Sequence, residues 1–415
     1  MQARRPQVNY SRAMRSVELF AGAGGLALGG EAAGLRPEMV VEWDRWACDT
    51  VRQNKAAGYP LMGPWRLHEG DVREVDWSWA GDTPIDVVTG GPPCQPFSMG
   101  GKARAADDKR DMFPAAIEVI RRLRPKAFVL ENVRGLTRSA FSNYFSYIQL
   151  QLGHPEIVSR SGETWLAHYH RLQVEHTTSG GSGGLRYNVV PTLVNAADYG
   201  VPQQRHRVFI VGFRSDLDAE WSFPDESHSY DALLYDQWVT GDYWDRHEVA
   251  TKNREPVSPR LMKRVAAIRD VNPDELAKPW LTVRDALSDL PEPTPNGSKK
   301  FKNHVLQPGA RSYPGHTGSP VDLPSKALKA GGHGVPGGEN MLRRPDGSVR
   351  YFTVRESARL QTFPDEYMLH GSWGEAMRQL GNAVPVLLAR KVAQSVTDHL
   401  QVADLRARAT KRSTA

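Results

Sequence analysis

Short apolar runs recur along the first half of the chain, and a cluster of glycine, acidic or other polar residues follows each of them. The runs lie at 16–20, 39–43, 85–89, 127–130 and 208–212. Helical patterns such as 114–123 lie between them. Because strands joined by crossover helices produce this alternation, the region is predicted to form a doubly wound, parallel α/β sheet. Ligands of such sheets bind beyond the carboxyl ends of the strands, so the polar clusters mark the expected site.

The alternation stops between about Arg214 and Arg350, where proline, glycine and charged residues are dense and apolar runs are short. This region is predicted to be a second, smaller domain with an irregular structure and long loops. Helical periodicity returns at 355–361 and again after Gly381. The last helix has one apolar face, formed by Leu388, Val392, Val396 and Leu400. That helix is predicted to pack back onto the first sheet.

The expected organisation is therefore a sheet domain built from two separated pieces, with the second domain inserted between them. The predicted segments are a basic tail (1–15), the first part of the sheet domain (16–215), the second domain (216–350), a hinge (351–374), the returning part of the sheet domain (375–403) and a basic tail (404–415).

Composition narrows the class of protein further. The 415 residues exceed what one hydrophobic core holds, which is about 250–300 residues. The formal net charge of +6 is compatible with a nucleic-acid partner without proving one. No apolar stretch is long enough to span a membrane, and the N-terminus lacks the core of a signal peptide, so we expect a cytoplasmic, nucleoid-associated protein. Two cysteines, Cys48 and Cys94, exclude a disulfide scaffold and a thiolate-rich zinc site, and no metal site is expected.

The glycine cluster after the first apolar run is a candidate ligand-binding turn. It contains Phe20, Gly22, Gly24 and Gly25. Glycines let backbone approach a ligand closely, and the helix that follows presents its N-terminus to an anion. A tight turn without any ligand is the alternative explanation of this cluster.

Acidic residues after the next strands strengthen the prediction of a cofactor site. Glu42 closes the second run and could hold ribose hydroxyls, Trp43 could stack on an adenine, and Asp71, next to Val72, could accept from an adenine amino group. A dinucleotide enzyme would share the first acid, but the whole set suits S-adenosylmethionine better. Each acid taken alone could also be an ordinary strand-end residue.

Cys94 is the candidate nucleophile. It stands in Gly-Pro-Pro-Cys-Gln-Pro-Phe-Ser (91–98), where prolines fix the backbone just before a thiol at a strand end. A buried structural cysteine is the alternative, but a proline-rich turn is a poor way to fill a core. Cys48, in contrast, lies in a helical pattern and is predicted to be structural.

Several further motifs occur in one order along the chain: Glu-Leu-Phe-Ala-Gly-Ala-Gly-Gly (18–25), Glu-Asn-Val (131–133), Gln-Gln-Arg-His-Arg (203–207), Arg-Glu-Ser-Ala-Arg (355–359) and Gly-Asn-Ala-Val-Pro (381–385). Together with the cysteine motif, they make the chain resemble the cytosine-C5 DNA methyltransferases of bacterial restriction–modification systems from about Ser16 to Leu400. The resemblance implies a Rossmann-like, S-adenosylmethionine-dependent sheet domain that releases S-adenosylhomocysteine. It also implies that the second domain recognises the DNA target.

The resemblance also implies roles for single residues. Cys94 would add to C6 of a flipped cytosine, Glu131 would hydrogen-bond or protonate N3, and Arg207 would reach O2. Arg205 would hold the neighbouring acid and backbone in place, and positive charge from Arg207 could lower the pKa of the thiol. The base that removes the C5 proton is not identified by the sequence.

The remaining candidates serve the cofactor or the DNA. Pro93, Asn382 and Val384 are expected to complete the cofactor pocket, with helix capping as the alternative for Asn382. A basic loop at 99–111 is expected to close over the base, or else to be a plain surface loop. The predicted DNA contacts are Gly100, Lys102, Arg110, Gln203, Arg343 and Arg344. For Gln203, support of the backbone is an equal alternative.

Three functions fit these observations. The first is a monomeric, sequence-specific methyltransferase for double-stranded DNA, paired functionally with a restriction endonuclease. The second is a relative that methylates transfer RNA, which the large second domain disfavours. The third is a catalytically silent DNA-binding regulator, which the presence of Cys94, Glu131, Arg205 and Arg207 disfavours.

Overall fold

A computed structural model describes residues 13–81, 84–93, 111–178, 184–330 and 340–413. Its centre is a seven-stranded sheet with the order β3-β2-β1-β4-β5-β8-β6. The strands are β1 (Met14–Leu19), β2 (Leu35–Glu42), β3 (Arg66–Glu69), β4 (Val87–Gly90), β5 (Ala127–Val133), β6 (Tyr187–Asn195) and β8 (His206–Arg214). Strands β1 to β5 are parallel. The order reverses between β1 and β4, which is where a ligand crevice forms in sheets of this type.

The predicted α/β sheet is confirmed, but one strand has the opposite direction from the prediction. β8 pairs antiparallel with both β5 and β6. Its connection from β6 consists of a single helical turn, Ala196–Tyr199, followed by Gly200 at φ 85° and the short strand β7 (Gln203–Gln204). That connection is too short for the crossover that a parallel strand requires.

Two strands were absent from the sequence prediction, and both lie at the edges of the sheet. β3 is short and mostly polar, and β6 contains Pro191. Edge strands tolerate proline and polar residues because one side of the strand has no ladder hydrogen bonds to make. They therefore lack the continuous apolar run that marks a central strand such as β5, which is buried from Ala127 to Asn132.

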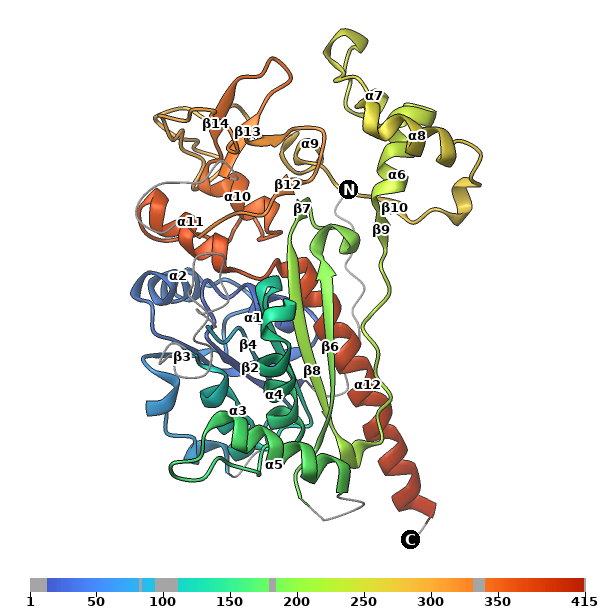
Figure 1. Cartoon of the computed structure of the whole chain (residues 1–415). Helices are drawn as coiled ribbons and strands as arrows, with labels where there is room; N and C mark the ends of the chain where they lie inside the picture. Colours follow the sequence, from blue (N-terminus) through green and yellow to red (C-terminus); the bar gives the residue numbers. More distant parts are fainter. Residues whose placement is uncertain (1–12, 82–83, 94–110, 179–183, 331–339, 414–415) are drawn as a thin grey trace.

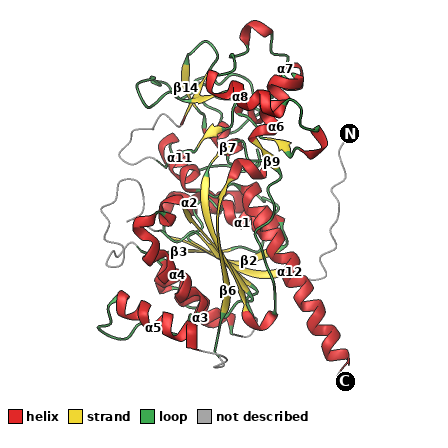
Figure 2. Cartoon of the chain, turned by 45° about the vertical axis from the view of Figure 1, so that its right-hand side comes forward, coloured by secondary structure: helices red, strands yellow, loops and turns green. Residues whose placement is uncertain are grey.

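Helices cover both faces of the sheet (Figures 1 and 2). One face carries α1 (Gly25–Ala32) and α12 (Val386–Ser413); the other carries α3 (Phe113–Leu123), α4 (Ser142–Gly153) and α5 (Trp165–Thr178). The four predicted apolar residues of the last helix, Leu388, Val392, Val396 and Leu400, are fully buried. Each such side chain stabilises the fold by roughly 1.5–3 kcal/mol. The return of the chain end to the first sheet is confirmed, and the helix continues past Leu400 to Ser413.

The second domain lies over the carboxyl ends of the parallel strands (Figures 1 and 2). Its elements are β9 (His228–Ser229), α6 (Tyr230–Tyr235), α7 (Asp242–Arg246), α8 (Pro259–Ile268), β10 (Lys278–Pro279), α9 (Val283–Leu287), β11 (Ser319–Pro320), β12 (Ser325–Lys326), β13 (Met341–Arg343) and β14 (Val349–Tyr351). The helices α6, α7 and α8 were not predicted from the sequence, because they are short and pack on small apolar clusters of their own.

Three helices connect the second domain with the sheet. α10 (Val354–Leu360) confirms the predicted helical periodicity, and a linking segment, 361–372, leads from it to α11 (Trp373–Asn382). α2 (Arg45–Ala56) follows β2 and packs beside α11. In addition, β12 pairs with β7, so a strand of the second domain lies directly against the Gln-Gln-Arg-His-Arg motif.

Candidate active site

The glycine cluster forms a tight turn between β1 and α1. Phe20 and Gly22 have φ values of 55° and 53°, and Gly24, at 81°, is the N-cap of α1. A Cβ placed on Gly22 would meet no atom within 4 Å, so the backbone here faces open space. The turn thus presents bare backbone at the switch point of the sheet, as a bound nucleotide-like ligand requires.

Glu42 closes the turn from the end of β2. Its Oε2 accepts a hydrogen bond from Gly22 N at 2.7 Å, and its Oε1 accepts from the amides of Trp43 and Asp44 at 2.9 and 2.8 Å. Burial raises the pKa of Glu42, while these three amides oppose the shift. Since Oε2 receives only one of these bonds, it retains the capacity for a further donor such as a ribose hydroxyl.

Cys48 lies behind Glu42 on α2. It is fully buried, and its thiol donates to the Glu42 carbonyl at 3.4 Å. The prediction that this cysteine is structural is therefore confirmed.

Trp43 and Asp71 lie beside the turn at the ends of β2 and β3. Trp43 is 73% exposed, which leaves its ring free to cover a ligand. Asp71 caps the single turn Val72–Glu74, and Arg73 Nε donates to its two carboxylate oxygens at 2.9 and 3.1 Å. The Arg73 guanidinium lowers the pKa of Asp71. A ligand amino group would therefore share this carboxylate with Arg73.

The turn before Cys94 is held at both sides. Asn132 Nδ2 donates to the Pro92 carbonyl at 2.9 Å, and Met112 N donates to the Pro93 carbonyl at 3.1 Å. Cys94 itself, together with Gly100, Lys102 and Arg110, lies outside the described residues. Because its preceding residues are anchored to β5 and to the start of α3, the chain enters the cysteine motif from a defined position at the end of β4.

A cavity of about 360 Å³ lies between the segment 72–77 and the start of α3, and Val72, Arg73, Trp77 and Met112 help to line it. Met112 was not among the site residues predicted from the sequence. Its position at the start of α3, directly after the basic loop 99–111, is the sequence feature that could have indicated it.

Glu131 and Arg207 form a buried ion pair at the ends of β5 and β8. Arg207 Nε lies 2.6 Å from Glu131 Oε1, and the two side chains are only 12% and 8% exposed. A Cβ on Gly91 would lie 3.3 Å from Glu131 Oε2, so the pair borders the cysteine turn. Burial raises the pKa of Glu131, against the opposing charges of Arg207 and Arg205. The structure thus brings together residues that the sequence separates widely.

Arg205 connects three parts of the chain and does not face open space. It is fully buried and donates to the carbonyls of Leu328, Gly381 and Ala383 at 3.1, 2.5 and 2.9 Å. These bonds tie β7 to the second domain and to the Gly-Asn-Ala-Val-Pro motif. Arg205 therefore positions backbone, and its charge also acts on Glu131.

Gln203 is fully buried, which does not match a DNA contact. Its Nε2 donates to the Leu360 carbonyl at 3.4 Å, and its Oε1 accepts from Leu328 N at 3.2 Å. The structure thus places Gln203 as a support of the backbone, the alternative that the sequence left open.

The Gly-Asn-Ala-Val-Pro motif meets the glycine turn. A Cβ on Gly25 would lie 2.4 Å from the Val384 carbonyl, so only glycine permits this contact. Asn382 is exposed and is the last residue of α11, whereas α12 begins at Val386. Capping of a helix start is therefore not its role here.

The two described arginines predicted to contact DNA are both ion-paired. Arg343 pairs with Glu255 at 3.1 Å and Arg344 with Glu292 at 2.7 Å. In the described part of the chain, no group of three or more histidine, cysteine, aspartate or glutamate side chains could hold a metal ion. Across those same residues, no helix combines the length and apolar character needed to cross a membrane.

The strand order, the glycine turn after β1 and the acid at the end of β2 define a Rossmann-like fold with a ligand crevice at its switch point. The chain belongs to the C-5 cytosine-specific DNA methylase family, whose model matches residues 14–154 and 180–398. Together with this family match, the fold makes the chain an S-adenosylmethionine-dependent methyltransferase. This assignment confirms the resemblance and the enzyme class, a DNA cytosine-5 methyltransferase.

Relatives and solved structures agree with this assignment. The type II methyltransferase M.PspPI of Psychrobacter sp. (strain TA137) is 31% identical over 399 residues, 95% of this chain and 82% of the relative. M.Eco47II of Escherichia coli is 31% identical over 92% of this chain and 78% of its own. The fold is similar to the crystal structure of Schizosaccharomyces pombe Dnmt2, with a TM-score of 0.52, 17% identity, and coverage of 94% of this chain and 98% of that one.

Proposed function

We propose that this enzyme methylates C5 of a cytosine flipped out of a specific duplex DNA sequence, through a covalent bond between Cys94 and C6. The observation that carries the proposal is the buried pair of Glu131 and Arg207 beside the turn 91–93, from which the chain leads to Cys94. By analogy with type II relatives, the reaction would protect DNA from a cognate restriction endonuclease.

The residues around the glycine turn fit S-adenosylmethionine. Gly22 faces open space, Glu42 Oε2 can accept a further hydrogen bond, and the exposed ring of Trp43 can cover an adenine. Asp71 and Val72 would contact the adenine edge, while Phe20, Pro93 and Asn382 would border the methionine part. When bound, the cofactor supplies an electrophilic methyl group.

The chain's own groups would carry the remaining chemistry. The Cys94 thiolate forms a bond to C6, and the displaced electron pair makes C5 nucleophilic. The raised pKa of Glu131 suits a carboxyl that holds a proton toward N3, while Arg207 offers guanidinium hydrogens to O2. After C5 accepts the methyl group, N3 would return its proton to Glu131 and a base such as bound water would take the C5 proton. Cleavage of the bond between sulfur and C6 would then restore the aromatic ring and the thiolate.

The decisive variant is Cys94→Ser. It should abolish transfer of labelled methyl groups to duplex DNA, because a hydroxyl is a much weaker nucleophile than a thiolate. Binding of S-adenosylhomocysteine, measured by calorimetry, should stay within about twofold of the original protein, since exchanging one sulfur atom for oxygen leaves the proposed cofactor residues in place. Retained turnover would refute the covalent mechanism, and methylation of transfer RNA in place of duplex DNA would refute the substrate.

A further inference from the structure

Tyr367 lies in the linking segment 361–372, yet its side chain reaches the glycine turn of the sheet domain. The side chain is fully buried, and the hydroxyl donates to the Ala23 carbonyl at 2.7 Å. A Cβ on Gly24 would lie 3.4 Å from the same hydroxyl. The linking segment thus contacts the backbone of the turn between the two glycines that shape it.

The donor is held in one orientation and one protonation state. Tyr59 meets the ring of Tyr367 edge-on at 5.4 Å, and Phe363 packs on it at the same centroid distance. Burial raises the pKa of Tyr367 above its ordinary value, so the hydroxyl carries its proton at neutral pH. The hydroxyl is therefore available as a donor to the Ala23 carbonyl.

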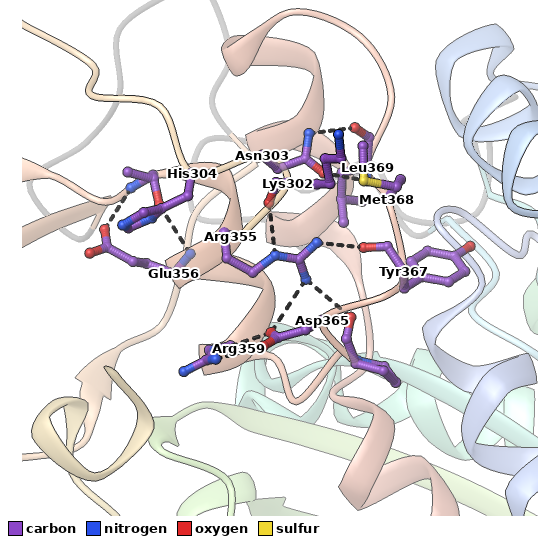
Figure 3. Close-up of polar contacts among 12 residues, drawn as sticks. Lys302, Asn303, His304, Arg355, Glu356, Arg359, Asp365, Tyr367, Met368 and Leu369 are labelled. Atoms are coloured by element: carbon purple, nitrogen blue, oxygen red, sulfur yellow. Dashed lines mark hydrogen bonds and ion pairs between the residues drawn. The ribbon is translucent and has the colours of Figure 1, made fainter. Parts of the chain in front are cut away.

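Arg355 fixes the backbone that carries Tyr367 (Figure 3). This fully buried guanidinium donates to the carbonyls of Tyr367, Pro364 and Lys302 at 2.8, 3.0 and 3.0 Å. Its nearest carboxylate, that of Asp365, lies 3.7 Å away. The Arg355 guanidinium thus binds backbone carbonyls, and one of them, that of Lys302, belongs to the second domain.

Two asparagines clamp the residues that follow Tyr367. Asn303 of the second domain exchanges hydrogen bonds with the backbone of Leu369 at 3.1 and 3.0 Å (Figure 3). Asn54 of α2 does the same with Met368 at 2.7 and 2.8 Å. Both domains therefore contribute hydrogen bonds that position the segment carrying Tyr367.

We propose that Tyr367 is a positioning residue of the cofactor site. Its hydroxyl holds the Ala23 carbonyl, and with it the glycine turn, in the conformation that binds the cofactor. Arg355 and Asn303 make that conformation depend on the second domain. This inference rests on the proposed binding of S-adenosylmethionine at the turn.

The test compares Tyr367→Phe with Tyr187→Phe. Tyr187 is also buried, and its hydroxyl also donates to a backbone carbonyl, that of Pro125, at 2.7 Å. That bond lies at the opposite end of the sheet, at the start of β5. The control variant thus loses the same kind of hydrogen bond without touching the turn.

Tyr367→Phe should raise the Kd of S-adenosylhomocysteine, measured by calorimetry, and the KM for S-adenosylmethionine by about threefold to tenfold, since one hydrogen bond is lost. Its kcat should stay within about twofold of the original value, because the reacting groups are unchanged. Both variants should lower Tm by a similar amount, but Tyr187→Phe should leave the Kd of S-adenosylhomocysteine and the KM for S-adenosylmethionine unchanged.

Asn303→Gly is the second variant. Asn303 has a φ of 61°, so glycine keeps the backbone conformation while both bonds to Leu369 are lost. It should raise the same Kd, though less than Tyr367→Phe does. An unchanged Kd in both variants, with Tm lowered as in Tyr187→Phe, would show a merely structural role and overturn the inference. If the original protein does not bind S-adenosylhomocysteine, the proposed function fails, and this inference fails with it.

Discussion

Buried charged side chains occur in both domains, but their partners differ. In the sheet domain, Glu131 and Arg207 pair at the strand ends, beside the turn that leads to Cys94. In the second domain, Asp322 accepts from Arg284 at 2.6 and 3.1 Å and from the Tyr243 hydroxyl at 2.9 Å. The first pair borders the site where chemistry is expected, whereas the second joins short elements to one another.

This difference follows from the size of the two cores. The sheet domain buries large apolar clusters on both faces, and these clusters supply most of its stability. The second domain has small clusters such as the one around Leu233 and Trp244. Its ion pairs and hydrogen bonds therefore carry more of its stability. The ion-paired arginines of this domain are accordingly interpreted first as structural residues and only second as candidate DNA contacts.

Glu131→Gln should show the largest effect and sharpen the comparison. The rate of methyl transfer in a single turnover should fall about 100-fold or more, because an amide cannot pass a proton to the base. The free energy of unfolding should fall by less than in Asp322→Ala, because the amide oxygen can still accept from Arg207 although the negative charge is lost. A rate within about tenfold of the original would contradict the assigned role.

Asp322→Ala tests how much the buried acid of the second domain contributes to stability. It should lower the free energy of unfolding by roughly 3 kcal/mol, because Arg284 and Tyr243 lose a shared, partly buried acceptor. Urea denaturation measures this loss. Affinity for S-adenosylhomocysteine should be unchanged, and loss of that affinity in the folded variant would show that the two regions are less separate than their contacts indicate.

Asp71→Ala should weaken S-adenosylhomocysteine binding about fivefold to twentyfold while leaving DNA binding unaffected, since the variant cannot form the charge-assisted hydrogen bond that we propose between Asp71 and the adenine. Asp76→Ala is the matched control, because Asp76 likewise accepts from a backbone amide two residues ahead, that of Ser78, on the same surface. Equal effects of the two variants in calorimetry would remove Asp71 from the cofactor site.

Glu18→Gln should have the smallest effect, on the pH dependence of stability. Burial in the sheet raises the pKa of Glu18 to about 8, while the Thr89 hydroxyl donates to it. The folded state therefore keeps a proton that the unfolded state releases near pH 4.5, and stability falls as pH rises between these values. Between pH 5 and pH 8, the Tm of the variant should fall by about a few degrees less than the Tm of the original protein. Parallel pH profiles of Tm would contradict this prediction.

The sequence predicted the sheet well because its central strands are apolar over their whole length, as in β5, and end in polar clusters. It also placed the last helix correctly from the spacing of Leu388, Val392, Val396 and Leu400. It missed the edge strands and the direction of β8, since neither depends on an apolar run. The helices of the second domain were missed for a related reason: short helices gain their stability from packing rather than from propensity.

The sequence by itself determined the class of enzyme and the residue types at each strand end. Methyl transfer to cytosine requires particular side chains, and the motifs that contain them occur in a characteristic order along the chain. The tertiary structure alone decided which of these side chains meet. It paired Glu131 with Arg207, buried Gln203 and Arg205 against backbone carbonyls, and brought Tyr367 to Ala23 across 344 positions of chain. Hydrogen bonds to backbone carbonyls leave no trace in the identity of the accepting residue, so the sequence indicated backbone support by Arg205 and Gln203 without identifying the carbonyls that they contact.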